Sequence, residues 1–136
     1  MQAVYYRTRS GRVPARESLN EYLGRRTTKN PDDLVAKISF AISYALEKNG
    51  VPGGGISAPL EHWKPLREIK INRGMYKIRI NYFCYVNQIV LFNFYVKKHE
   101  YSPRGPEARK VDRMIQEAWS YYKDFIINPS QYEKYQ

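Results

Sequence analysis

Three segments near the middle of the chain decide the predicted fold: LREIKI at 66–71, MYKIRINYFCY at 75–85 and IVLFNFYV at 89–96. They are rich in β-branched and aromatic residues, and turn signals separate them at residues 72–74 and near 87–88. Alternate side chains of a strand point to opposite faces. The second segment therefore places two sets of side chains on opposite faces: Tyr76, Ile78, Ile80 and Tyr82, against Lys77, Arg79 and Asn81. The segments predict an antiparallel meander with one apolar and one basic face, whose third strand is apolar on both sides and therefore central.

The residues before the meander predict one strand and two helices. Residues 3–7 are short, β-branched and aromatic, which favours a first strand. A helix is expected from Pro14 to Leu23, since proline is favoured at the first helical position. A second helix is expected to begin at residues 30–33 and to end at 49–50, because apolar residues recur between them at three- and four-residue spacing. Residues 51–59 contain three consecutive glycines and are predicted to form a mobile connection.

The C-terminal part predicts one more helix. Pro103 and Pro106 interrupt the chain, and an amphipathic pattern then runs from about Glu107 into the Phe125 region. The predicted architecture is an α+β fold. It has an antiparallel sheet of about four strands, two N-terminal helices packed on one face, a C-terminal helix, and the other face partly open. We expect residues 1–128 to form a single domain and residues 129–136 a C-terminal tail.

Composition argues against several classes of protein. The longest apolar run, 89–96, is far shorter than the roughly 20 residues of a membrane-spanning helix, and the N-terminus does not resemble a secretory signal. A cytoplasmic protein is therefore expected. The single cysteine, Cys84, forms no internal disulfide, and with two distant histidines it makes a poor zinc site. Neither a metal nor a cofactor is predicted, and Cys84 is expected to be a packing residue.

The charge of the chain is large, positive and unevenly distributed. Lys and Arg number 23 against 13 Asp and Glu, a formal net charge of +10. Residues 64–113 hold 12 of the basic residues and only 4 of the acidic ones. A surplus of this size attracts polyanions. Its concentration on adjacent predicted strands favours a nucleic-acid partner over a merely soluble surface.

Neighbouring predicted strands bring polar side chains to the basic face. Glu68 and Lys70 are two residues apart and project to one side, next to Lys77, Arg79 and Asn81 of the following strand. The end of the third strand adds residues 97–101. The predicted site is shallow and basic. It lacks the paired carboxylates of a glycosidase and the Ser-His-Asp order, and no Lys-Ser/Thr follows Gly53–Gly55 as a phosphate-binding loop requires.

These residues resemble a known family. Glu68-Ile69-Lys70, Arg79 and Tyr95-Val96-Lys97-Lys98, followed by a proline and a final helix, are similar in order and spacing to the phage-derived, HigB-like branch of the RelE/ParE toxin superfamily. The chain departs from the pattern at three positions. Lys70 stands where arginine is usual, Tyr95 replaces phenylalanine, and His99 replaces a small hydroxyl residue.

The resemblance implies a RelE-like fold and the toxin of a type II toxin–antitoxin system. Such a toxin is an endoribonuclease, an mRNA interferase that cleaves mRNA without a metal on the translating ribosome and so inhibits translation. A cognate antitoxin holds it inactive. The implied partners are the antitoxin, mRNA and the ribosome, with no membrane, and the free protein is expected to be a monomer or part of a toxin–antitoxin hetero-oligomer.

The implied chemistry needs a base for the 2′-hydroxyl, positive charge for the phosphate and an acid for the leaving 5′-oxygen. The candidate catalytic residues are Glu68, Lys70, Arg79, Lys97, Lys98, His99 and Tyr101. Arg79 with Lys97 or Lys98 would stabilise the phosphate, and Glu68 or His99 would act as the base. Lys70, Tyr101 or His99 would supply the acid or further charge. The candidate RNA-binding residues are Arg67, Arg73, Lys77 and Arg104.

Other readings stay open at this point. The protein can be a non-catalytic ParE-like inhibitor of a protein target such as DNA gyrase, or a degenerate RNA-binding relative. Glu68 and Lys70 can form an ordinary exposed ion pair, and Lys97 and Lys98 can simply protect a strand end from aggregation. His99 can be a loop residue without a role.

Overall fold

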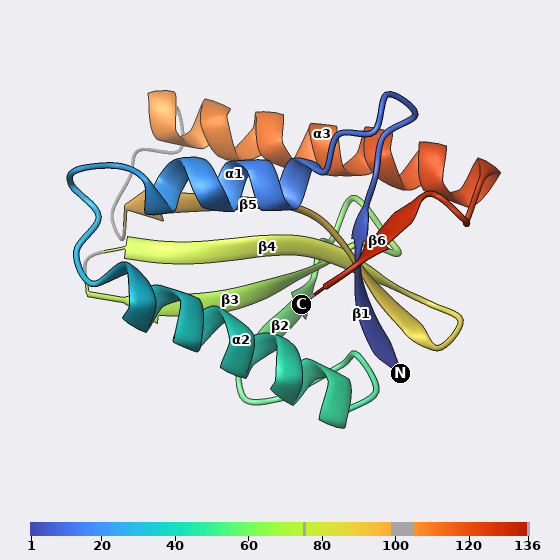
Figure 1. Ribbon diagram of the computed structural model, residues 1–136, viewed down its shortest axis with the longest axis horizontal. Coiled ribbons are helices and arrows are strands. Elements are labelled where there is room, and N and C mark those ends of the chain that lie inside the picture. Colours follow the sequence, from blue (N-terminus) through green and yellow to red (C-terminus); the bar gives the residue numbers. More distant parts are fainter. Residues whose placement is uncertain (75, 99–104, 136) are drawn as a thin grey trace.

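The computed structural model describes residues 1–74, 76–98 and 105–135, except for the side chain of Lys98. This part of the chain forms three helices and a six-stranded, mostly antiparallel sheet, an α+β fold (Figure 1). The elements are β1 (Gln2–Tyr6), α1 (Pro14–Leu23), α2 (Pro31–Glu47), β2 (Ser57–Pro59), β3 (Arg67–Arg73), β4 (Tyr76–Tyr85), β5 (Gln88–Lys98), α3 (Pro106–Ile127) and β6 (Tyr132–Lys134). The three predicted helices are all present. None of the described helices is long and apolar enough to cross a membrane.

The strand order in the sheet is β2-β3-β4-β5-β1-β6. Strands β3, β4 and β5 form the predicted antiparallel meander. The expectation of a purely antiparallel sheet is wrong, because β1 pairs with β5 in parallel, with Gln2 opposite Gln88 and Tyr5 opposite Leu91. The cause is the connection through α1 and α2. It returns the chain to the starting end of the sheet, so that β1 runs in the same direction as β3 and β5.

Two short strands lie where the sequence predicted irregular segments. Strand β2 falls within the expected mobile connection and pairs with residues 67–69 of β3. Strand β6 falls within the expected tail, which is therefore not a tail, and pairs antiparallel with β1. The ring of Tyr135 packs edge-on against Tyr5, with the ring centroids 5.5 Å apart. Both segments cover a strand edge that would otherwise be unpaired, which explains why such short pieces are ordered.

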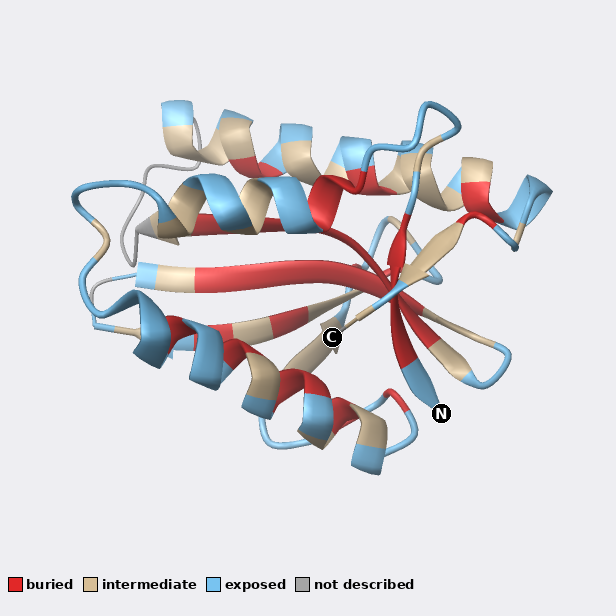
Figure 2. Ribbon diagram, viewed as in Figure 1, coloured by how far each residue is buried: buried red, intermediate tan, exposed pale blue. Residues whose placement is uncertain are grey.

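The first face of the sheet is covered by α1 and α2. The apolar stripe of α2 supplies Leu34, Ile38 and Ile42 to this core. They pack against alternate residues of the meander, among them Ile69, Ile71, Ile78, Ile80, Leu91 and Phe94. Figure 2 shows that the central strands are buried along most of their length. The first core thus consists of alternate apolar side chains of the strands, as the sequence pattern predicted.

The second face of the sheet is covered in part by α3. Ala118 and Phe125 of α3 pack on Phe83 and Phe92 and are fully buried. The second face is therefore closed over the aromatic parts of β4 and β5, and the expectation of a partly open face applies only to the rest of it. The amphipathic pattern of α3 showed that it needed an apolar partner, and the face left free by α1 and α2 provides one.

A β-bulge separates the apolar and polar parts of the second face. The pairing of β4 with β5 shifts register between Asn81 and Tyr82. As a result Phe92 and Asn93 both contribute to the second face, Phe92 in the aromatic core and Asn93 opposite Asn81. The bulge marks the point at which this face changes from aromatic to charged residues.

Candidate active site

Four charged side chains from three neighbouring strands lie together on the polar part of the second face. They are Glu68 and Lys70 on β3, Arg79 on β4 and Lys97 on β5, and we call them the Arg79 cluster. Lys70 lies directly opposite Arg79 in the register of the two strands. The charges of Glu68, Lys70 and Arg79 are close enough to Lys97 to change the pKa of its amine. The structure thus brings together four of the seven residues proposed as catalytic.

Glu68 lies between two cations without a hydrogen bond to either. Its Oε2 is 3.9 Å from Nε of Arg79, and its Oε1 is 4.0 Å from Nζ of Lys70. Both distances exceed the 2.7–3.2 Å usual for a hydrogen bond of this type, so Glu68 interacts with these two cations by charge attraction. The side chain of Glu68 is 16% exposed. Its oxygen atoms therefore keep the capacity to accept a proton or a hydroxyl group.

The guanidinium of Arg79 is the buried part of the cluster. Arg79 is 5% exposed, and its Nη1 donates to the carbonyl of Ile78 at 3.0 Å. Its Nε makes no hydrogen bond within the described part of the chain. This buried nitrogen lies 3.9 Å from Oε2 of Glu68, whose negative charge compensates in part for the missing hydrogen bond. The guanidinium of Arg79 is therefore packed within the sheet and is not exposed on the predicted basic face.

Lys97 has a lowered pKa. Partial burial has the largest effect, and the positive charges of Arg79 and Lys70 lower the pKa further, against the opposing effect of Glu68 and Glu107. Desolvation and like charges both disfavour the protonated amine. Lys97 therefore has a larger neutral fraction near neutral pH than an ordinary lysine, and a neutral amine can accept a proton.

An amide bridge ties α3 to the sheet next to the cluster. The amide nitrogen of Asn81 donates to Oδ1 of Asn93 at 2.9 Å, and the amide nitrogen of Asn93 donates to the carbonyl of Met114 at 2.8 Å. Asn81 is opposite Glu68 and is fully buried. The bridge fixes α3 to the sheet beside the Arg79 cluster.

Two of the candidate RNA-binding residues are placed away from the cluster. Arg67 lies on the first face, where its Nε donates to the hydroxyl of Ser57 at 3.0 Å. Arg73 is directed to the start of α2, where it donates to the carbonyl of Asn30 at 3.1 Å and pairs with Asp33 at 3.4 Å. Both occupy odd-numbered positions of β3, and these face away from Glu68 and Lys70. Lys77 is opposite Lys97 and does share the cluster's face.

The remaining candidates cannot be placed from the described residues. His99, Tyr101 and Arg104 lie outside them, as does the side chain of Lys98. Their proposed roles stay predictions.

Two residues near the cluster were not among the candidates. Tyr95 is buried and lies opposite Arg79, and Glu107 in the first turn of α3 contributes negative charge at Lys97. The spacing of Tyr95, two residues before Lys97, could have indicated a shared face. No local signal could have indicated Glu107, because its approach depends on how α3 docks on the sheet.

The described residues contain no group of three or more His, Cys, Asp or Glu that could hold a metal ion. Cys84 donates to the carbonyl of Gly50 at 3.4 Å, and burial raises the pKa of its thiol, which disfavours a nucleophilic role. Comparison of the chain with protein-family models, curated proteins and solved structures found no match.

Proposed function

We propose that the protein is a metal-independent endoribonuclease of the RelE-like toxin type that cleaves mRNA on the translating ribosome. The observation that carries the proposal is the Arg79 cluster, which combines a lysine of lowered pKa, a carboxylate and two further cations. The cluster lies in the region that holds most of the chain's positive charge. This function requires a cytoplasmic location and a cognate antitoxin.

The proposed reaction is an attack of the RNA 2′-oxygen on the adjacent phosphorus. The Glu68 carboxylate, or the neutral fraction of Lys97, takes the 2′-hydroxyl proton. The new phosphorus–oxygen bond forms as the bond to the 5′-oxygen breaks, and that oxygen takes a proton from the protonated base or from the ammonium of Lys70. The products are a 2′,3′-cyclic phosphate and a 5′-hydroxyl end.

Arg79 and Lys70 are suited to stabilise the negative charge that builds up on the phosphate. A cation held in a fixed, partly desolvated position stabilises a transition state more than a solvated one does. The lowered pKa of Lys97 raises the neutral fraction of its amine, so we expect Lys97 to take part in proton transfer as well as to contact the phosphate. The role of Lys97 is thus more specific than the residue pattern alone indicated.

The test is cleavage of a defined mRNA by the purified protein with translating ribosomes, followed by mapping of the new 5′ ends. Lys97→Met should reduce the rate about 100-fold or more, as loss of a general base usually does. Lys123→Met removes the same charge from an exposed position of α3 and serves as the matched control. The new 5′ ends should carry hydroxyl groups, as cleavage through a 2′,3′-cyclic phosphate requires.

Two variants of Arg79 separate the loss of a catalytic charge from misfolding. Arg79→Lys keeps a positive charge in the floor of the site, whereas Arg79→Met removes it, and near-ultraviolet circular dichroism reports whether each variant is folded. Rates unchanged in folded Lys97→Met and Arg79→Met would refute the proposed site. Growth arrest of expressing cells with intact transcripts would refute the nuclease and favour an inhibitor of a protein target.

A further inference from the structure

Half of one edge of β5 has no strand neighbour among the described residues. On one side, β5 pairs with β4 along nearly its whole length. On the other side, β1 pairs only with residues 88–91. From Phe92 onward this edge of β5 presents its backbone groups to the space between α1 and α3. Unpaired backbone groups of this kind form a template for another strand.

Two side chains take the place of the missing strand. The hydroxyl of Ser18 on α1 accepts a hydrogen bond from the backbone N–H of Phe94 at 3.2 Å. The ammonium of Lys110 on α3 donates to the carbonyl of Val96 at 3.0 Å. Phe94 and Val96 are two residues apart, so their backbone groups point to the same side. Both substitutes are side chains that can rotate away without unfolding the sheet.

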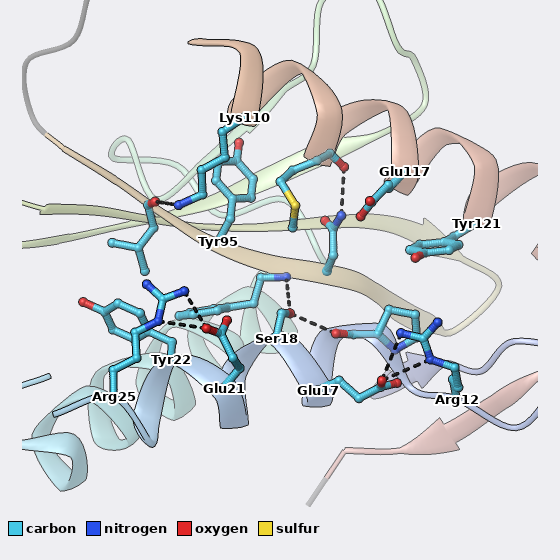
Figure 3. A pocket seen from close by; sticks show the side chains of 15 residues that line it. Arg12, Glu17, Ser18, Glu21, Tyr22, Arg25, Tyr95, Lys110, Glu117 and Tyr121 are labelled. Atoms are coloured by element: carbon cyan, nitrogen blue, oxygen red, sulfur yellow. Dashed lines mark hydrogen bonds and ion pairs between the residues drawn. The ribbon is translucent and has the colours of Figure 1, made fainter. Parts of the chain in front are cut away.

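The edge forms the floor of a groove of about 440 Å³ (Figure 3). Tyr22 of α1 lines one wall, and Met114 and Tyr121 of α3 line the other. The groove carries three basic and three acidic side chains: Arg12, Arg25, Lys110, Glu17, Glu21 and Glu117. Its lining is therefore neutral, in a chain with a formal net charge of +10.

We propose that this groove binds an extended segment of a partner protein, which adds to the sheet as a strand beside residues 94–96 of β5. The spacing of the backbone groups on the edge matches a peptide backbone, which would displace the substitute bonds of Ser18 and Lys110. Alternate side chains of the segment would meet Tyr22 on one wall and Met114 with Tyr121 on the other. A neutral groove gives no electrostatic advantage to a nucleic acid, whose binding depends on phosphate neutralisation. The inference does not depend on nuclease activity.

The test selects short random peptides displayed on phage against the full-length protein and then titrates the synthetic peptides by NMR. Bound peptides should slow hydrogen exchange of the Phe94 and Val96 amides. N-methylation of alternate peptide residues should weaken binding about tenfold, the effect of losing one or two hydrogen bonds. Glu117→Trp places a bulky ring in the groove and should weaken binding by about the same factor. Gln116→Trp, exposed on the same helix but outside the groove, should not.

Several results would overturn the proposal. These are failure to select any peptide, peptides that leave the Phe94 and Val96 amides unaffected, and equal binding to the two tryptophan variants. If exchange of the Phe94 and Val96 amides slowed only when the protein self-associates, the edge would bind a second copy of this chain. Protection by an RNA oligonucleotide would assign it to nucleic acid. Each of these results is independent of the cleavage rates that test the proposed function.

Discussion

The two faces of the sheet are covered by helices in different ways. Under α1 and α2 the first face is apolar, from Ile71 at one end to Ile89 at the other. The second face is aromatic beneath the C-terminal half of α3, and on the other side of the bulge it becomes polar and charged at Asn81, Arg79 and Glu68.

The difference shows where this chain keeps an energetically unfavourable arrangement. Burying an amide or a charge is unfavourable unless partners compensate for lost water. Asn81 is fully buried and Arg79 nearly so, and neither side chain has all of its polar atoms hydrogen-bonded within the described residues. The first face serves stability throughout. The second combines a stabilising aromatic half with a charged half suited to chemistry.

The largest expected effect is on the aromatic half of the second face. Phe125→Ala should lower the free energy of unfolding by about 3–5 kcal/mol, because it removes a large, fully buried ring. Ile127→Ala, 72% exposed at the end of the same helix, is the control and should have little effect. Urea unfolding measures both. Equal effects of the two variants would mean that α3 does not form a second core.

On the first face, Gly50→Ala tests the packing where α2 ends. Gly50 has φ +85°, and an added Cβ would lie 2.5 Å from Sγ of Cys84. Left-handed backbone and overpacking together should destabilise the variant by about 2–4 kcal/mol in urea unfolding. At Gly53 no atom lies within 4 Å of an added Cβ, so Gly53→Ala should be nearly neutral. If Gly50→Ala and Gly53→Ala lost the same amount of stability, the close approach of Gly50 to Cys84 would not limit packing on the first face.

At the boundary between the two halves, Asn93→Ala breaks the amide bridge. Asn81 then loses its hydrogen bond to Oδ1 of Asn93, and α3 loses the hydrogen bond at the carbonyl of Met114, so we expect a loss of about 1–3 kcal/mol. Asn72→Ala, exposed on β3, is the matched control. Urea unfolding gives the stability, and hydrogen exchange of α3 amides shows whether the helix loosens. An unchanged free energy of unfolding in Asn93→Ala would show that the bridge does not stabilise the fold.

The smallest expected effect is a gain in stability at the charged half. The pKa of Lys97 is lower in the folded than in the unfolded protein, so the unfolded state binds more protons between those two values. The contribution of Lys97 to stability therefore rises with pH from the lowered value toward about 10.4, and below that range the charged lysine is destabilising. Lys97→Met should be more stable than wild type at pH 7, by less than about 1 kcal/mol because solvent screens a half-buried group.

This last prediction is checked by urea unfolding of wild type and Lys97→Met between pH 7 and pH 10. The stability difference should shrink as the pH rises, whereas Lys123→Met should show no such convergence. A variant less stable than wild type at pH 7 would mean that Lys97 serves the fold. Higher stability together with lost cleavage would be the expected signature of a functional lysine.

Much of the fold was predictable because its signals are local. Proline at the start predicted where α1 and α2 begin, apolar residues at helical spacing predicted α2 and α3, and alternation with turn residues predicted the meander. The strands β2 and β6 escaped prediction because three residues carry too little pattern. Their order comes from pairing with residues distant in sequence.

The candidate site was predictable to the same degree. Glu68, Lys70 and Arg79 were grouped correctly, since alternation along a hairpin is a local property. The same alternation, applied to Arg67 and Arg73, would have excluded them from that face. Charge alone had suggested both. The approach of Glu107 to Lys97 depends on the docking of α3, which no local pattern specifies, and the burial of Arg79 is likewise a property of the folded chain.

The sequence by itself determined which residues share a strand face, where the helices begin and where positive charge concentrates, because each depends on near neighbours in the chain. Only the tertiary structure decided that β1 runs parallel to β5, that α3 covers half of the second face, and that Lys97 meets Arg79 in a partly desolvated site. These features arise from contacts between distant segments. The energies of these contacts depend on exclusion of water, and no segment is shielded from water before the chain has folded.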